Sequence, residues 1–481
     1  MQEFIKIEIP NFVLLLPELI VLLTGFFIFT LDILLKRVSH LIAISVSSAG
    51  YIASIIVLLL IYGHRGETLY GLYVRDGLST IFQIFMVFLT LILLSVFYPY
   101  FKTRSSLYPE FYYILSFSLA GAMFLVSSYN LVVLYVAIEA VSIGFYILTA
   151  LLRGSFESKE GALKYLILGG LSIALASYGA GFMYLHSGSL DLRHIFLYGQ
   201  SDALIIGLLF FMVGFAIKLG AVPFHFWLPD AYQGAPTPIT AFMASVGKIA
   251  FFAPILRMIP LVQGDILREW ILAVSTVSGL TMIYGNLIAL NQKDVKRLLA
   301  YSSIANTGYV LAGISTASMI GFKASSFFLL AYAIMSFMSF AIIALLERFK
   351  DFKTEIETLL GLRNISPAYA SFLALSLISL LGVPPTVGFV AKALIFLSLA
   401  ESRLWYLAIV MIVATGISAG YYLKLISKMF MFEPRFSSNV KPSMSESLTL
   451  SLLGLLVVLL GILPILLFGP VSQSVEAIFS R

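Results

Sequence analysis

The sequence predicts an all-α, polytopic integral membrane protein, and three observations support this prediction. Of the 481 residues, 60% are hydrophobic and only 11% are charged, whereas about 25% of residues are charged in ordinary globular domains. Apolar runs of about 20 residues, the length that crosses the hydrocarbon core of a bilayer, recur along the whole chain. Prolines and glycines interrupt two of these runs close to a lysine. A soluble fold of this length could not bury so much apolar surface.

The apolar runs predict about fourteen transmembrane helices. The first run, from Asn11 to Leu35, lacks a basic leading region and a small-residue cleavage site, so we interpret it as a retained helix and not a signal peptide. The run from 297 is the most polar, because Asn306 and several serines interrupt it. The expected spans are 12–34, 40–62, 77–99, 110–128, 130–152, 161–185, 203–222 with a broken continuation to about 233, 236–258, 269–290, 297–317, 322–347, 366–400 with a break at Pro384, 405–431 and 446–470.

The distribution of lysine and arginine between the loops predicts the orientation. An even number of spans places both termini on one side, and basic residues collect in the cytoplasmic loops. Loops on the terminal side carry Lys6, Arg65, Arg75, Arg193, Arg257, Arg268, Lys323, Arg403 and Arg481. The opposite loops carry a larger set, namely Lys36, Arg37, Lys102, Arg104, Arg153, Lys159, Lys293, Lys296, Arg297, Arg348, Lys350, Lys353, Arg363, Lys428, Arg435 and Lys441. We therefore expect a bacterial-type inner (plasma) membrane protein with both termini on the non-cytoplasmic side.

Five lysines remain inside the expected spans: Lys164, Lys218, Lys248, Lys392 and Lys424. A charged side chain at the bilayer centre costs about 2.5–3.5 kcal/mol on insertion scales, so such residues usually face protein or water and mark ion or proton paths. A buried lysine can release its proton, whereas arginine stays charged. Snorkelling to the interface is the preferred explanation of Lys424 and an equal alternative for Lys164, but it explains the other three lysines poorly.

Two of these lysines lie beside predicted helix breaks. Lys218 precedes Pro223, and Lys392 follows Pro384 and Pro385. A single kink would mean little, because Gly and Pro are frequent in membrane helices. Broken helices that occupy corresponding positions in two halves of a chain are the best sequence indication of a transport site.

The breaks do occupy corresponding positions, since they fall in the fourth helix of two five-span blocks, 110–258 and 269–431. An odd number of spans per block inserts the two blocks with opposite topology, which is the inverted repeat of many transporters. The expected domains are a three-helix segment over 1–109, a first repeat over 110–260, a second, inverted repeat over 261–432 and a C-terminal transmembrane helix over 433–481.

Glu139 is the only acidic residue expected in the middle of a span. Beside a lysine it would be ionised and would favour the charged form of that lysine. Two interpretations remain open. The contact could open and close and so control when the lysine holds its proton, or it could be a static ion pair that fixes helix packing. Buried pairs stabilise poorly compared with apolar packing, which favours the first interpretation.

Three further side chains are relay candidates. His225 follows the first break and could pass protons near neutral pH, or could only hydrogen-bond the freed backbone. Tyr301 could donate within a polar file or anchor the helix at the interface. Lys296 could end a proton path or be an ordinary residue of a cytoplasmic loop.

Redox and nucleotide chemistry are not expected in this chain. It contains no cysteine and only five scattered histidines, so thiolate metal sites, Fe–S clusters and a histidine metal cluster are not predicted. No glycine-rich phosphate-binding motif follows a strand. The net charge of +6 reflects loop residues and not a nucleic-acid-binding patch.

Three segments, WLPDAYQGAPTPITAF, QKDVKRLLAYSSIANTGY and GVPPTVGFVAKA, resemble the antiporter-like membrane subunits of respiratory complex I (NADH–quinone oxidoreductase). The resemblance extends over nearly the whole chain, and YQGAPTP is similar to the subunit N group of that family. It implies proton export driven by electron transfer in partner subunits, which would hold the NADH, flavin, Fe–S and quinone sites. The expected partners are the other complex I membrane subunits and the lipid bilayer, with no cofactor in this chain.

The resemblance also implies roles for individual residues, and the proton-relay set is Glu139, Lys164, Lys218, His225, Lys248, Lys296, Tyr301 and Lys392. Glu139 would pair with Lys218, Lys248 would connect the two halves, and Lys392 would be the terminal lysine near the outlet. The chain departs from the family at Asn306, where a histidine is usual. Because asparagine carries no proton charge, the second path would use water, Tyr301 or Lys296 there.

Two alternative functions remain at this stage. The same fold could serve a cation/proton antiporter or a membrane-bound hydrogenase, and partner identity separates these from complex I. The chain could also be a passive structural subunit whose buried charges only hold its neighbours. Loss of activity on removal of Lys218 would separate both active functions from the passive one.

The predicted orientation can be tested with a C-terminal reporter that is active only in the cytoplasm. We expect no signal, because the larger set of basic loop residues lies on the opposite side of the membrane from the termini. A strong signal would reverse the orientation and the direction of the proposed proton movement.

Overall fold

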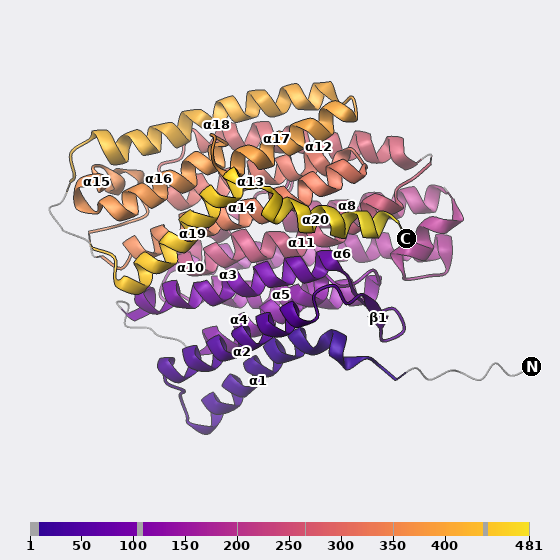
Figure 1. Cartoon of the computed structure of the whole chain (residues 1–481), viewed down its shortest axis with the longest axis horizontal. Helices are drawn as coiled ribbons and strands as arrows, with labels where there is room; N and C mark the ends of the chain where they lie inside the picture. The colour runs from indigo at the N-terminus through magenta and orange to yellow at the C-terminus, as the bar shows by residue number, and fades with distance from the viewer. Residues whose placement is uncertain are drawn as a thin grey trace, which may run out of the picture.

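The structure is a computed structural model that describes residues 9–102, 109–199, 201–264, 266–349, 351–435 and 441–480. The loop residues Lys6, Arg104, Lys350 and Arg481 lie outside these ranges. The described chain is almost entirely helical, and its one sheet is a two-stranded antiparallel hairpin. Figure 1 shows the long helices lying roughly parallel, with α1 and α2 along one side of the bundle and α18 along the other.

The N-terminal segment consists of three long helices and the hairpin. Its elements are η1 (Phe12–Leu15), α1 (Leu16–Leu34), α2 (His40–Leu60), β1 (Gly66–Thr68), β2 (Tyr73–Arg75) and α3 (Gly77–Lys102). The Ser39 side chain accepts a hydrogen bond from the Ile42 amide and so caps α2. Many apolar side chains of α1 and α2 are exposed, as expected for helices that face lipid.

The next block contains the first helix break. Its elements are α4 (Glu110–Leu125), α5 (Leu131–Thr149), α6 (Phe156–Ser187), α7 (Leu192–Ile195), η2 (Phe196–Tyr198), α8 (Asp202–Leu219), α9 (Trp227–Gly234), α10 (Thr237–Phe242), η3 (Met243–Gly247), α11 (Lys248–Met258) and η4 (Ile259–Leu261). The α8 helix ends at Gly220, whose φ of +67° favours glycine. Pro223 follows and, having no N–H, cannot continue the ladder.

The third block contains the second break and is followed by the C-terminal helices. Its elements are α12 (Ile266–Ala289), α13 (Val295–Ser315), α14 (Met319–Leu346), η5 (Ile356–Leu359), α15 (Leu362–Ile365), α16 (Pro367–Leu381), α17 (Val387–Glu401), α18 (Trp405–Met431), α19 (Met444–Ile462) and α20 (Ile465–Phe479). The α16 helix ends like α8, at Gly382 with a φ of +89°, two residues before Pro384.

The all-α membrane fold predicted from the sequence is confirmed, and every expected span coincides with a helix. Eleven of the described helices are long and apolar enough to cross a membrane, and three shorter apolar helices accompany them. The α13 helix forms as predicted but does not meet this hydropathy criterion, so the count of fourteen stays a prediction. The last expected span differs in form: the helix over 446–470 divides at Leu463 and Pro464, and the second part, α20, continues to Phe479.

The centre of the bundle is α14, which packs against α3, α10, α13, α16, α17 and α20. The most apolar stretch of α14 is wholly buried, as is that of the Thr237–Leu261 segment. Other helices therefore surround α14 over this stretch, whereas α1 and α2 leave many apolar side chains exposed.

Two equivalent backbone bridges relate the five-helix blocks. In the first block the start of α5 pairs with the loop after α6: the Leu131 amide donates to the Leu190 carbonyl (2.8 Å) and the Leu192 amide to the Tyr129 carbonyl (3.0 Å). In the second block the start of α13 pairs with the loop after α14: the Val295 amide donates to the Thr354 carbonyl (2.7 Å) and the Ile356 amide to the Lys293 carbonyl (2.8 Å).

The two bridges lie near opposite ends of the helices. An ion pair between Arg193 and Glu67 holds the first bridge beside the β1 hairpin, and the second bridge leads through η5 into α15. Figure 1 shows β1 and α15 at opposite ends of the bundle. This opposite placement supports the proposed inverted repeats over 110–260 and 261–432.

Two arginines assigned to loops from the sequence are buried instead, which corrects that assignment. Arg75 is fully buried and donates to both carboxylate oxygens of Glu18 (3.0 Å each). Arg257, 1% exposed, donates to both carboxylate oxygens of Asp76 (2.7 and 3.2 Å). The buried cations therefore include arginines as well as the lysines expected from the sequence. Removing both arginines from the terminal-side loops makes the charge bias between the two sides larger.

The Asp76–Arg257 pair joins the N-terminal segment to α11, and we predict that Asp76→Asn destabilises the protein by about 3–5 kcal/mol, because it leaves a buried guanidinium unpaired. Asp202→Asn, at an exposed position, is the control and should change little. The double variant Asp76→Asn/Arg257→Met should recover part of the loss. Thermal unfolding of the purified complex measures each effect, and equal unfolding of Asp76→Asn and the control would contradict the assignment.

The same pair makes stability depend on pH. Burial acts to raise the pKa of Asp76, but the adjacent Arg257 guanidinium and the hydrogen bonds from Ser79 together outweigh burial and hold the pKa below its usual range. The stabilisation is therefore fully present above the ordinary aspartate pKa of about 3.9 and is lost as the pH falls below it.

Candidate functional site

The first part of the site is the pair formed by Glu139 on α5 and Lys218 in the last turn of α8. The Lys218 Nζ atom lies 3.7 Å from Glu139 Oε1 and donates to the Ser142 hydroxyl (2.7 Å) and the Tyr146 hydroxyl (3.2 Å). Glu139, Ser142 and Tyr146 recur at helical spacing, so one face of α5 offers Lys218 three successive oxygen atoms.

The two charges differ in their surroundings. The Lys218 side chain is 2% exposed, whereas the Glu139 side chain is 35% exposed. Glu139 Oε1 accepts no hydrogen bond from the described residues. The pair is thus an ion contact without a hydrogen bond, with the carboxylate at the edge of the bundle and the amine inside it.

The second part of the site is Lys248, which pairs a carbonyl freed by the first break. Its Nζ atom donates to the Leu219 carbonyl (2.6 Å) and to the Thr307 hydroxyl (2.7 Å). Leu219 is the last residue of α8, so its carbonyl has lost its helical partner. Lys248 thereby connects the broken helix of the first block to α13 of the second.

A π-helical turn, η3, immediately precedes Lys248. Such turns shift the register of the following side chains and are frequent at functional sites. The sequence gives no sign of this turn.

The third part of the site repeats this arrangement at the second break. The Lys392 Nζ atom donates to the Leu381 carbonyl (2.8 Å) and lies 4.7 Å from the centre of the Tyr309 ring. Leu381 is the last residue of α16, just as Leu219 is the last residue of α8. Each break therefore presents its final carbonyl to a buried lysine.

The α13 helix connects these two lysines. Thr307 accepts from Lys248, and Tyr309, half a turn later, presents its ring to Lys392. Ser303 and Asn306 lie on the same helix, and the Ser303 hydroxyl and the Asn306 side-chain carbonyl are buried with no hydrogen-bond partner among the described residues. Asn306 instead donates to the Ser302 carbonyl (2.8 Å).

The remaining buried or partly buried candidates are His225, Lys296 and Tyr301. His225 is 3% exposed, packs its ring against Tyr284 and has no described partner for Nδ1. Lys296 is buried and donates to the Ala235 carbonyl (2.6 Å). Tyr301 is partly buried beside Arg297.

Lys164 does not join the buried group. Its side chain is 43% exposed and forms ion pairs with Glu160 (2.7 Å) and Asp230 (2.6 Å). Asp230 also accepts from Arg297 (2.5 Å). The sequence did not indicate that Asp230 would pair with two cations, although this residue lies within the WLPDAYQGAPTPITAF segment.

The structure offers no metal site among the residues that it describes: no group of three or more histidine or acidic side chains is close enough to hold an ion. What the arrangement can do is bind and release protons on amines that are held by carbonyls, hydroxyls and one carboxylate.

The C-terminal helices complete the second break. A Cβ atom built on Gly461 of α19 would lie 2.1 Å from the Pro385 carbonyl oxygen and 2.7 Å from Thr386 Cα. The α19 helix thus packs on the backbone between α16 and α17, and only glycine fits there. The α19 helix itself ends directly afterwards, at Leu463 and Pro464.

Paired broken helices with buried lysines inside an apolar helical bundle define the class of antiporter-like membrane subunits. A chain of "Respiratory complex I from Thermus thermophilus with bound Aureothin" superposes with a TM-score of 0.82 at 30% sequence identity, covering 94% of this chain and 98% of that chain. A chain of the archaeal membrane-bound sulfane sulfur reductase shares the fold, with a TM-score of 0.87 at 24% identity, covering 97% of this chain and 98% of that chain.

The chain belongs to the NADH–quinone oxidoreductase subunit N family. The family model described as "NADH:quinone oxidoreductase/Mrp antiporter, TM" matches residues 128–418. Subunit N 2 of Aquifex aeolicus is 52% identical over 98% of both chains, and subunit N of Thioalkalivibrio sulfidiphilus is 34% identical over 98% of this chain and 99% of the relative. These comparisons confirm the family that the three sequence segments predicted.

The packing of α19 on the second break gives a matched pair of glycine substitutions. Gly461→Ala should destabilise the protein by about 1–3 kcal/mol, because an added methyl group has no space against Pro385 and Thr386. Gly416→Ala is the control, since no atom lies within 4 Å of its added Cβ, and it should be neutral or slightly stabilising. Thermal unfolding of the purified complex compares the two variants. Equal stability would show that the backbone at the second break moves easily to make room for the methyl group.

Proposed function

We propose that this chain is a proton-translocating membrane subunit of an NADH–quinone oxidoreductase, and that it exports protons through its buried lysines. The observation that carries the proposal is the connected series Glu139–Lys218–Lys248–Lys392. The backbone at Leu219 joins Lys218 to Lys248, and α13 joins Lys248 to Lys392. Amines are suited to this role because lysine, unlike arginine, can lose its proton when desolvated.

The Glu139–Lys218 contact is the proposed control point. At an effective dielectric constant of about 20, doubling a separation of about 4 Å between unit charges removes about 2 kcal/mol of attraction, which is a change of more than tenfold in a proton equilibrium. Ser142 and Tyr146 already hold the amine by hydrogen bonds. Movement of the Glu139 carboxylate could therefore change the charge state of Lys218 without displacing its amine.

The connection from Lys248 to Lys392 is proposed to run along α13 and to include water. The unpaired Ser303 hydroxyl and Asn306 carbonyl are buried polar atoms, and such atoms usually hold ordered water. Water there would supply the proton-carrying step that asparagine cannot. His225 is proposed to assist near the first break, and Lys296, Tyr301 and Lys164 to lie on entry routes.

Electron transfer is proposed to take place in partner subunits, which would hold NADH, flavin, Fe–S clusters and quinone. The chain would sit among the other membrane subunits of the complex, in a bacterial-type inner membrane with both termini outside the cytoplasm. Glu139, at the edge of the bundle, is the group through which a neighbouring subunit could act on the buried lysines.

Substitutions at the first pair test the proposal. In the purified complex reconstituted into liposomes, Lys218→Ala and Glu139→Gln should each lower NADH-driven proton uptake several-fold with the complex still assembled. Lys218→Arg should also impair uptake, because arginine keeps its proton. Lys424→Ala, at an exposed position on α18, is the control and should pump normally.

The double variant Glu139→Gln/Lys218→Ala separates a working pair from two independent effects. Because the two residues act as one unit, its loss should be close to that of Lys218→Ala alone. Normal pumping by Lys218→Arg would show that a fixed charge suffices, and fully additive losses would show that the residues do not act as a pair.

A further inference from the structure

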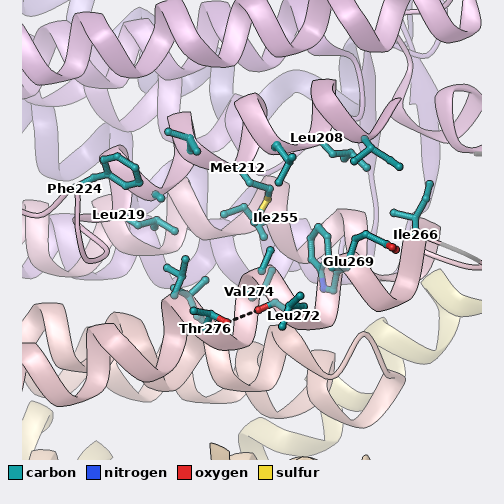
Figure 2. A pocket seen from close by; sticks show the side chains of 18 residues that line it. Leu208, Met212, Leu219, Phe224, Ile255, Ile266, Glu269, Leu272, Val274 and Thr276 are labelled. Atoms are coloured by element: carbon teal, nitrogen blue, oxygen red, sulfur yellow. Dashed lines mark hydrogen bonds between the residues drawn. The ribbon is translucent and has the colours of Figure 1, made fainter. Parts of the chain in front are cut away.

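An apolar groove of about 380 Å³ opens between α8, α11 and α12, along the seam between the two five-helix blocks (Figure 2). Its walls are aliphatic and aromatic, with Glu269 and Thr276 as the polar exceptions among the lining side chains. Thr276 satisfies its hydroxyl by donating to the Leu272 carbonyl (2.7 Å). Leu209 and Leu272 are 50% and 67% exposed beside it, so the groove opens on an apolar outer face of the bundle.

The two ends of the groove have different chemistry. Figure 2 shows Glu269 and Ile266 at one end and Leu219 and Phe224 at the other. Leu219 and Phe224 flank the first helix break, and the Leu219 carbonyl is the acceptor of Lys248. This end of the groove therefore lies beside the first break.

A polar cavity of about 1160 Å³ lies next to the other end, and Ile266 lines both spaces. Within this cavity Arg193 is already paired with Glu67 and Asp191. Arg65, which also lines it, is exposed and has no ion-pair partner among the described residues.

Glu269, at the mouth of the groove, is likewise exposed and has no partner in the described part of the chain. Glu269 thus offers a free carboxylate at the mouth of the groove, and Arg65 offers a free guanidinium in the neighbouring cavity. This combination suits a ligand that has an apolar chain and a head group with both charges.

The dimensions of the groove select the kind of apolar chain. Ile205 and Leu219 line its two ends on α8, and at 1.5 Å per residue they are about 21 Å apart along the helix. This is sufficient for half of a hydrocarbon core of about 30 Å. Spread over about 21 Å, the volume gives a mean cross-sectional area of roughly 18 Å², far below the roughly 80 Å² that a helix about 10 Å across would occupy. The groove therefore fits one extended acyl chain and excludes a partner helix.

We propose that this groove binds one acyl chain of a zwitterionic phospholipid with a phosphoethanolamine head group. The phosphate would lie at Arg65 and the ammonium group at Glu269, each making a charge-assisted hydrogen bond. The acyl chain would reach Leu219 and Phe224 and fill the space beside the first break. Binding itself is independent of proton translocation; only an effect of the lipid on pumping rests on the proposed function.

Photolabelling of the intact complex tests the proposal. The probe is a phosphatidylethanolamine with a diazirine near the end of its acyl chain, and the same chain is also tested on phosphatidylglycerol and phosphatidylcholine. In the wild-type complex the ethanolamine probe should label peptides within 205–224 and 266–277 several-fold more than the other two probes. Equal labelling by all three would overturn the head-group assignment, and no labelling of these peptides would overturn the site.

Ala273→Trp fills the groove, since Ala273 lines it, and should remove this labelling. Ala174→Trp, at an exposed position on α6 outside the groove, is the matched control and should leave it unchanged. If Ala273→Trp fails to assemble, Arg65→Gln and Glu269→Gln decide, because both alter exposed side chains. Each should abolish the preference for ethanolamine, and a preference that persists in both variants would overturn the assignment.

Pumping is measured separately on the same preparations. If Ala273→Trp removes labelling but the complex still pumps protons normally, the lipid-binding site is supported. Only an effect of the lipid on pumping is then ruled out. Loss of pumping in Lys218→Ala with normal labelling would support the proposed function alone.

Discussion

Each helix break depends on a lysine, and each of these lysines depends on a break. A backbone carbonyl without a partner at bilayer depth costs several kcal/mol, and so does a buried amine. Lys248 on the Leu219 carbonyl and Lys392 on the Leu381 carbonyl satisfy both needs with one hydrogen bond each. The carbonyl ends of α8 and α16 also carry the negative end of the helix dipole, which favours a cation there. The interior of the bundle can therefore hold positive charge without a carboxylate at every lysine.

Lys218 differs from the other two lysines because a carboxylate, that of Glu139, lies beside it. Among the described residues, Glu139 is the acidic partner of Lys218, while Lys248 and Lys392 are held by carbonyls, a hydroxyl and a ring face. Carbonyls and hydroxyls are fixed dipoles, whereas a carboxylate at the edge of the bundle can move or be neutralised from outside. A signal that arrives at Glu139 would change the charge on Lys218, which is one residue from the Leu219 carbonyl that Lys248 uses. The proposed control element and the proposed relay are thus connected through the backbone.

The sequence predicted the positions of the spans and of both breaks, because apolar length and proline leave direct traces. The contact of Glu139 with Lys218 followed only from family resemblance, since no local pattern relates residues on α5 and α8. The acceptor role of Leu219 and Leu381 could not be predicted, because any residue supplies a carbonyl. Arg75 and Arg257 were assigned to loops because a lone arginine near a span end has the same hydropathy whether it is exposed or paired. Lys164 was placed among the membrane lysines, yet its partners Glu160 and Asp230 come from a neighbouring turn and from a distant helix.

The two breaks share one design but differ in what surrounds them. At the second break, Gly461 of α19 lies against the Pro385 carbonyl with no space for a methyl group. At the first break, Leu219 and Phe224 border a groove that the protein itself leaves unfilled. A close-packed backbone resists displacement, because movement costs contacts on all sides, whereas a backbone beside a groove loses fewer contacts when it shifts. Each break is packed on one side only, since Leu219, Ala221 and Val222 are buried at the first break, whereas Val383, Pro384 and Pro385 are exposed at the second. At the second break the contact with Gly461 restricts one side of the backbone, close to the lysine that would accept a proton in the proposed relay.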